Sequence, residues 1–142
     1  PLMGGSAILG AQPAFAQTPP AAQSQQVVVH LGSYTNDLHS AFMAFSLATN
    51  LQKAGAKVTV FLDREGVRLA DARERGDLTW GDSGGTAAAM ADFVKAGGKI
   101  LVCPHCAHLA GIEKQNVRPG SSLATQDEVT KLFLAATKVI DF

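Results

Sequence analysis

The sequence predicts an α/β fold, a three-layer sandwich in which a mainly parallel sheet is flanked by helices. Three observations predict it. Short β-branched and apolar runs alternate with longer helical segments, which is typical of parallel strands joined by crossover helices. The chain has 142 residues, of which 46% are hydrophobic, so a single ordinary core is sufficient. No internal repeat suggests a solenoid or a propeller.

The first sixteen residues are typical of an export signal rather than of a domain. Residues 2–11 form a short apolar run, and residues 14–16 (Ala-Phe-Ala) have the small-x-small form of a signal-peptidase site. The run is too short for a membrane span, which needs about 20 apolar residues. We therefore expect a signal-peptide remnant over 1–16 and no stable membrane span. A disordered apolar tail is the alternative.

The chain starts at Pro1 with no charged segment before the apolar run, so we expect the beginning of the signal to be missing. Residues 17–26 (QTPPAAQSQQ) are polar and contain two prolines, which predicts a flexible linker. The folded domain then covers 27–142. The expected location is the bacterial periplasm or the cell exterior, where disulfides can persist.

The domain begins with a strand and a helix. Val27–Leu31 is a continuous apolar run that predicts a buried strand. Asn36 or Asp37 can cap a helix that runs to about Ala54 and stops at Gly55. Apolar residues lie on more than one face of this helix, which predicts either an oligomer contact or a crowded monomer core. They are Leu38, Phe42 and Phe45 on one face, and Met43, Leu47 and Leu51 on another.

The second strand is predicted at Lys57–Leu62, with a turn over Asp63–Gly66 and an amphipathic or irregular segment over Val67–Arg75. A glycine-rich loop follows at Asp77–Gly85. Thr86 is the expected cap of the next helix, which ends at the pair Gly97 and Gly98.

The third strand is predicted at Lys99–Val102, followed by a short helix to Gly111 and a loop over 112–124. Thr125 and Glu128 form a capping box for the last helix. Its apolar face repeats at helical spacing, through Val129, Leu132, Phe133 and Ala136, and Val139–Phe142 is the expected terminal strand.

Charge and cysteine content exclude two classes of protein. Lys and Arg total 12 and Asp and Glu total 12, and nucleic-acid binding needs clustered cations, so we expect no nucleic-acid partner. The chain has 2 cysteines, which excludes a disulfide-rich scaffold. In a parallel sheet, reactive groups lie beyond the carboxyl ends of the strands. Loops 32–37, 63–66 and 103–106 are therefore expected to meet.

Both cysteines fall in one of these loops. Pro104 suits the first turn of a helix, so Cys103 would be the N-cap and Cys106 the third helical residue. A helix start and a CxxC spacing both stabilise the thiolate, which is the nucleophilic form. Cys103 is thus the candidate for attack on sulfur, and Cys106 the candidate for resolving the intermediate.

Other uses of this Cys-Pro-His-Cys segment stay open. The pair could be structurally inert. A metal site needs four ligands, which would strain the local geometry. Its candidate ligands are Cys103, Cys106, His105 and His108, with help from His30 or His39. Covalent haem attachment fails because Ala107 follows the motif, and no phosphate-loop or serine-hydrolase motif indicates another cofactor.

Three stretches carry a resemblance to a known family: VVVHLGSYTNDLHSAFMAFSLATNL, KVTVFLDREGVRLA and KILVCPHCAHLAGI, with LFLAATKVIDF closing the chain. Together they resemble the DsrE/DsrF/TusD-like sulfur-relay family from Val27 to Phe142. The resemblance implies a DsrE-like fold, a persulfide carried on the cysteine directly after the strand, here Cys103, and a CxxC partner in Cys106. It also implies a trimer or hexamer. The family often has Arg where this chain has Ala110.

The leading hypothesis is an exported sulfur carrier or sulfurtransferase-like protein that holds a persulfide on Cys103. Its partner would be a sulfur donor or acceptor protein or a small sulfane-sulfur compound. One alternative is a periplasmic thiol–disulfide oxidoreductase that uses both cysteines. A non-catalytic module that binds a metal or a protein is the other.

Overall fold

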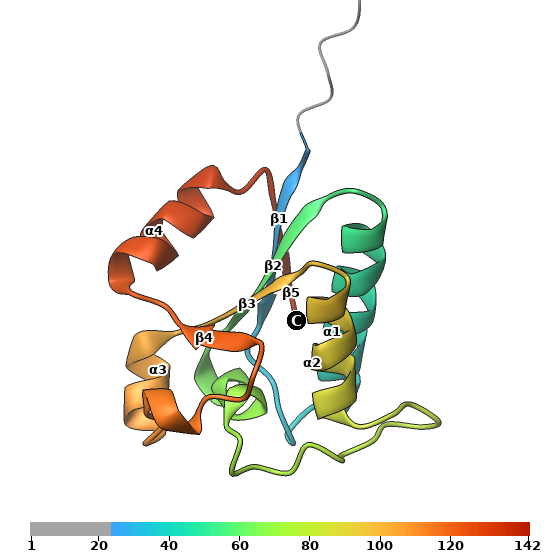
Figure 1. The fold of residues 1–142 in the computed structure, drawn as a ribbon, viewed down its shortest axis with the longest axis vertical. Coiled ribbons are helices and arrows are strands. Elements are labelled where there is room, and N and C mark those ends of the chain that lie inside the picture. Colours follow the sequence, from blue (N-terminus) through green and yellow to red (C-terminus); the bar gives the residue numbers. More distant parts are fainter. Residues whose placement is uncertain (1–23) are drawn as a thin grey trace, which may run out of the picture.

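The computed structural model describes residues 24–142, so the expected signal remnant and most of the expected linker lie outside the described residues. Helices and strands alternate along this part of the chain (Figure 1). In chain order they are β1 (Gln26–Leu31), α1 (Leu38–Lys53), β2 (Lys57–Leu62), the 3-10 helix η1 (Arg64–Ala70), α2 (Thr86–Lys95), β3 (Lys99–Val102), α3 (Pro104–Leu109), the 3-10 helix η2 (Lys114–Asn116), β4 (Ser121–Leu123), α4 (Gln126–Ala135) and β5 (Lys138–Asp141).

The five strands form one sheet in the order β4-β3-β2-β1-β5, and every neighbouring pair is parallel. Helices α1 and α2 cover one face of the sheet, and α4 covers the other (Figure 1). Helix α3 follows β3 at the carboxyl ends of the strands. The predicted α/β three-layer fold is therefore confirmed.

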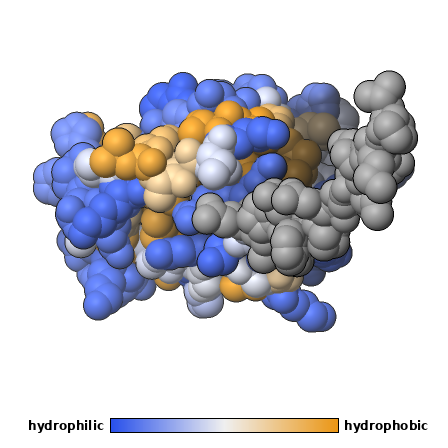
Figure 2. All heavy atoms as spheres, turned by 90° about the horizontal axis from the view of Figure 1, so that it is seen from above, coloured by the Kyte–Doolittle hydropathy of each residue, from blue (hydrophilic) through white to orange (hydrophobic). Residues whose placement is uncertain are grey.

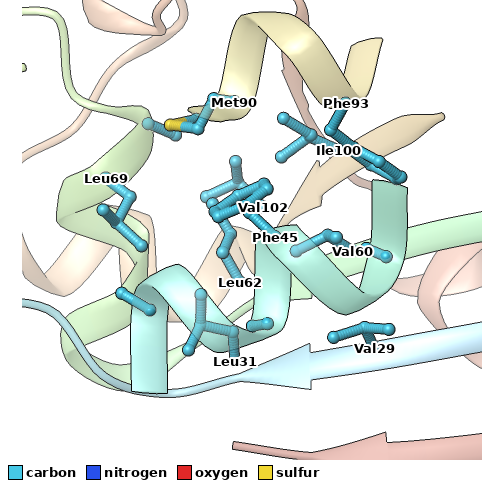
Figure 3. Close-up of a cluster of buried hydrophobic side chains, with 14 of the residues drawn as sticks. Val29, Leu31, Phe45, Val60, Leu62, Leu69, Met90, Phe93, Ile100 and Val102 are labelled. Carbon is cyan, nitrogen blue, oxygen red and sulfur yellow. The ribbon is translucent and has the colours of Figure 1, made fainter. Parts of the chain in front are cut away.

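The alternation of side chains along each strand divides the core between the two faces. Val29 and Leu31 of β1 point towards α1 and α2, where they pack with Phe45 and Phe93 (Figure 3). Val28 points to the opposite face and belongs to a smaller cluster under α4. Covering on both faces explains why β1 is apolar at consecutive positions.

One prediction for the second half of the chain is wrong in detail. Residues 112–124, expected to be a loop, contain η2 and the edge strand β4. Strand β4 is short and carries two serines, so its pairing with β3 decides its conformation rather than any apolar pattern. The segment Val67–Arg75, expected to be amphipathic or irregular, starts within η1 and continues beyond Ala70 as turns and a bend.

The helix caps follow the expected chemistry with one exception. Asp37 caps α1 by accepting the Ser40 N–H at 3.0 Å. The predicted capping box of α4 is present, with both reciprocal hydrogen bonds between Thr125 and Glu128. In α2, however, Gly85 is the cap and Thr86 the first helical residue. A side chain at Gly85 would bring its Cβ to 2.5 Å from the Gly76 carbonyl oxygen, so only glycine fits.

Helix α1 is buried on one side within the single chain. Its buried residues are Ala41, Ala44, Phe45 and Ala48. Met43, on the other side, is 46% exposed. The core of the single chain accounts for Leu51, which packs against it, but not for Met43.

Among residues 24–142, the helices are all too short or too polar to cross a lipid bilayer.

Candidate functional site

Cys103 lies at the junction between β3 and α3, as the sequence predicts. Its backbone N–H donates to the Leu62 carbonyl at 2.8 Å and so extends the pairing of β3 with β2. It is then the N-cap of α3, with Pro104 in the first turn. Cys103 therefore both ends the strand and places its thiol at the carboxyl edge of the sheet.

Cys106, the third residue of α3, faces Cys103. Its backbone N–H donates to the Cys103 Sγ at 3.5 Å, within the range for sulfur acceptors. Burial raises the pKa of the Cys106 thiol, and a hydrogen bond to Cys103 together with the charge of Asp63 raises that pKa further. A hydrogen bond from the Arg64 backbone acts in the opposite direction. Both cysteines are free and half-buried.

The three loops predicted to converge do meet at this edge. The Arg64 side chain lies directly over Gly32, so closely that a Cβ at Gly32 would overlap the guanidinium. A Cβ at Gly66 would lie 2.3 Å from the Leu31 carbonyl oxygen. Arg64 has φ of 45°, which makes it the one non-glycine residue of the described chain in the left-handed region. The turn after β2 therefore lies between the end of β1 and Cys106.

A polar cluster beside the thiols was missed by sequence reasoning. His30 of β1 makes ion pairs through both ring nitrogens, with Asp63 at 2.9 Å from Nε2 and with Asp141 at 2.6 Å from Nδ1. Burial lowers the pKa of His30, but the two carboxylates outweigh it, and the pKa lies above its ordinary value. The position of the three residues in the sequence could have indicated the cluster, because His30, Asp63 and Asp141 each lie at or just beyond the end of a strand.

Arginines hold the segments that surround the site. Arg73 forms a bidentate pair with the buried Asp71 and donates to the Gly111 carbonyl at 2.9 Å, which fixes the end of α3. Arg118 donates to the carbonyls of Leu69, Asp71 and Glu74, and so closes the segment that follows η1. These contacts are structural, and they hold α3 against the sheet.

The candidate metal ligands are not brought together. Across residues 24–142, no group of three or more His, Cys, Asp or Glu side chains is placed to hold a metal ion. His105 and His108 are exposed on α3. His39 stacks on Trp80 with ring centroids 3.9 Å apart, and His30 is engaged by two carboxylates.

The thiols do not line the groove of about 630 Å³ between α1 and α2. That groove is bordered by residues such as Phe42, Lys53 and Asp92, on the face of the sheet that α1 and α2 cover. Cys103 and Cys106 instead lie on the surface at the end of the sheet. Chemistry at these thiols would therefore be open to a partner molecule.

Comparisons with known proteins agree with this geometry. The model of the DsrE/DsrF-like family matches residues 26–142. The YchN protein of E. coli has 22% sequence identity and a TM-score of 0.68, over 84% of this chain and 100% of that one. MTH1491 of Methanobacterium thermoautotrophicum, titled a protein of unknown function, has 12% identity and a TM-score of 0.63, with the same coverage.

A third solved structure, BT1422 of Bacteroides thetaiotaomicron, is also titled a protein of unknown function. It has 15% identity and a TM-score of 0.57, over 82% of this chain and 94% of that one. None of the curated proteins matches the chain. At these identities the solved structures show a shared fold, whereas the family model covers the whole described domain except its first residues. The chain belongs to the DsrE/DsrF-like family.

Proposed function

We propose that this protein is a sulfur carrier that holds sulfane sulfur as a persulfide on Cys103 and releases it with the help of Cys106. Membership of the DsrE/DsrF-like family supports a sulfur-relay-type domain in general. The observation that carries the finer proposal is the pairing of the two thiols. Cys103 Sγ accepts a hydrogen bond from the Cys106 backbone, and Cys106 keeps its proton because its pKa is raised.

Loading requires a thiolate and a donor that already contains sulfane sulfur. The Cys103 thiolate attacks the terminal sulfur of a donor persulfide, a new S–S bond forms, and the donor leaves as a thiolate. The total oxidation level does not change, so no outside oxidant is needed. The Cys103 sulfur suits this step because it is half-buried at a strand end, where a partner sulfur can approach it.

Release uses the second cysteine. The Cys106 thiolate attacks Cys103 Sγ, a disulfide forms between the two cysteines, and hydrosulfide leaves and takes up a proton. A thiol reductant then has to restore both cysteines before the next cycle. The raised pKa of Cys106 favours the loaded state, because a protonated thiol does not attack.

The position of the half-buried thiols at the end of the sheet favours a partner protein as donor or acceptor, with a small sulfane-sulfur compound as the alternative. Neither cysteine lines the groove between α1 and α2. A protein thiol can instead reach Cys103 across the open end of the sheet.

Mass spectrometry of the intact protein tests this proposal. After incubation with a persulfide donor, we expect the mass of one additional sulfur atom on Cys103, and none in Cys103→Ser. Cys106→Ser should accept sulfur and keep it longer than the unsubstituted protein. If sulfur were found on Cys106, or on neither cysteine, the proposal would be wrong.

The second candidate function, a thiol–disulfide oxidoreductase, rests on the same contact between the Cys106 backbone N–H and Cys103 Sγ. It predicts turnover of disulfide substrates, which a sulfur carrier does not need. Insulin reduction and a glutathione redox titration separate the two functions. Absence of turnover with both disulfide substrates would eliminate the oxidoreductase. A non-catalytic module would show neither sulfur loading nor turnover, and its metal form would retain metal after purification under reducing conditions.

We also propose that the protein is exported and forms a homo-oligomer. Met43 and Leu134 support an oligomer, because both are exposed apolar residues and Leu134 is 83% exposed. Figure 2 shows apolar side chains gathered in a band among polar ones, at the end of the molecule remote from α3. Light scattering on purified protein gives the oligomeric state, and cell fractionation gives the location. A monomer at micromolar concentration would contradict the homo-oligomer, and a cytoplasmic location would contradict export.

A further inference from the structure

A chain of charged side chains crosses the carboxyl edge of the sheet and ends beside the sulfur atoms. It begins at Asp141 in β5, passes through His30 in β1 to Asp63 after β2, and continues to Arg64. Asp141 and Asp63 bind the two nitrogens of His30 at 2.6 and 2.9 Å. The Arg64 Nε donates to the other oxygen of Asp63 at 3.0 Å. Each contact is within normal hydrogen-bond distance, so the chain is continuous.

The state of the imidazole follows from its partners. Both partners are carboxylates, which accept hydrogen bonds when they are ionised, so His30 must donate from both nitrogens and carry a positive charge. The side chain of His30 is 20% exposed, and the side chain of Asp63 is 21% exposed. From the neighbouring elements, Phe61 of β2 and Phe133 of α4 lie against the ring with centroids 5.9 and 6.3 Å away. Asp63 and Asp141 are therefore the charged groups that face His30.

The chain reaches Cys106 in two ways. Asp63 and Cys103 directly follow the paired strand residues Leu62 and Val102, so the Asp63–Arg64 turn lies beside the cysteines. The Arg64 backbone lowers the pKa of Cys106 and so favours its thiolate. The same residue has φ of 45°, a strained conformation that persists only when neighbouring contacts hold it. The Asp63 charge acts on the same sulfur in the opposite sense and disfavours the thiolate.

We propose that His30 is a positioning residue for Cys106: clamped between Asp141 and Asp63, it neutralises the Asp63 charge beside the sulfur and holds the Asp63–Arg64 turn that points a backbone N–H at Cys106. It touches neither a reacting sulfur nor a substrate. Loss of its positive charge removes one of the two cations paired with the Asp63 carboxylate, the other being Arg64, and the Cys106 thiolate becomes harder to form. If the proposed function is right, His30 thereby sets how fast a persulfide on Cys103 is released.

The first test measures how fast Cys106 is alkylated by iodoacetamide in a Cys103→Ser background, where Cys106 is the only thiol. His30→Gln should slow this reaction at neutral pH by roughly threefold to tenfold, since one unit of pKa changes the thiolate fraction about tenfold. Asp63→Asn should not slow it, because the opposing charge is gone. With Asp63→Asn already present, His30→Gln should have no further effect.

A second histidine, His39, provides a matched control. His39 is exposed and stacks on Trp80, and neither residue takes part in the chain of ion pairs. His39→Gln should leave the alkylation rate within about twofold of the parent. Circular dichroism should confirm that each variant is folded.

The pH profile of the alkylation rate gives a readout that a purely structural role would not produce. As pH rises through the pKa of His30, the imidazolium charge is lost just where more thiolate would otherwise form. The alkylation rate should therefore rise less steeply with pH than for one ionising group, and His30→Gln should restore the single-group profile.

Two results would overturn the proposal. One is a folded His30→Gln variant that alkylates at the parent rate with an unchanged pH profile. The other is that His30→Gln slows alkylation of Cys106 equally in the presence and absence of Asp63→Asn, which would show that His30 does not act through Asp63. Alkylation does not involve sulfur transfer, so the proposed sulfur carriage can fail while this inference holds, and the reverse is also true.

Discussion

The two faces of the sheet are built differently. The face under α1 and α2 buries a large apolar cluster that includes Phe45, Phe93 and Met90. The face under α4 buries only Val28, Phe61, Leu101 and Ala124, and no residue of α4 is itself fully buried. Cys103 contacts both clusters. The comparison indicates that the face under α1 and α2 supplies most of the stability, and that the face under α4 supplies less.

The largest expected effect is on the α1 and α2 face. Phe93 is fully buried, lies against Phe45 at 6.0 Å between ring centroids, and packs under the backbone of Gly98. Phe93→Ala should lower the free energy of unfolding by about 3–5 kcal/mol. Urea denaturation followed by circular dichroism measures this loss. A loss similar to that of a surface substitution would contradict the division between the faces.

The corresponding substitution on the other face is Phe133→Ala in α4. Phe133 is half-buried and meets Phe61 edge-to-face at 5.3 Å. Its loss should cost about 1–2 kcal/mol, because only part of the ring is removed from water and the aromatic pair adds about 0.5–1.5 kcal/mol. Lys131→Ala is the matched control on the same helix. The Lys131 side chain is 74% exposed, and its substitution should change stability by less than about 0.5 kcal/mol.

The start of α4 offers a smaller effect that leaves the aromatic contacts in place. Thr125→Ala removes the side chain that accepts the Glu128 N–H at 3.2 Å. The expected loss is about 1 kcal/mol of unfolding free energy. Amide hydrogen exchange should locate the loosening in α4 and leave α1 and α2 protected. Equal loosening of both faces would show that they are not independent.

The smallest expected effect is the pH dependence contributed by His30. Its folded-state pKa is raised above 6.5 by the two carboxylates, so the stabilisation is fully present below the unfolded value and is lost as pH rises through the folded value. The Asp141 side chain is 75% exposed, and solvent screening keeps this contribution small. As pH rises through the folded-state pKa of His30, the unfolding free energy of the parent should fall relative to that of His30→Gln. Parallel curves of unfolding free energy against pH would refute this contribution of His30.

The sequence predicted those parts of the structure that local chemistry decides. The order strand, Cys103, Pro104, helix is sufficient to place one thiol at a helix cap and the other one turn later, as the structure has it. The capping box at Thr125 is similarly local. In both cases the residues that interact lie within three positions of one another.

The polar cluster could not be predicted in that way. His30 and Asp141 are separated by 111 positions, and they meet because β5 pairs with β1 at the edge of the sheet. Nothing in the local pattern specifies this strand order. Strand β4 was missed for a related reason, since the neighbouring β3 rather than its own serines keeps it extended.

The pairing of β5 with β1 also sets an order of events during synthesis. Strand β1 is made first and β5 after every other strand of the sheet, so Asp141 reaches His30 only when the remaining elements have left the ribosome. The closing hydrogen bond from the Phe142 N–H to the His30 carbonyl, at 2.9 Å, depends on the same late strand. A growing chain therefore contains both cysteines before it contains the completed cluster beside them.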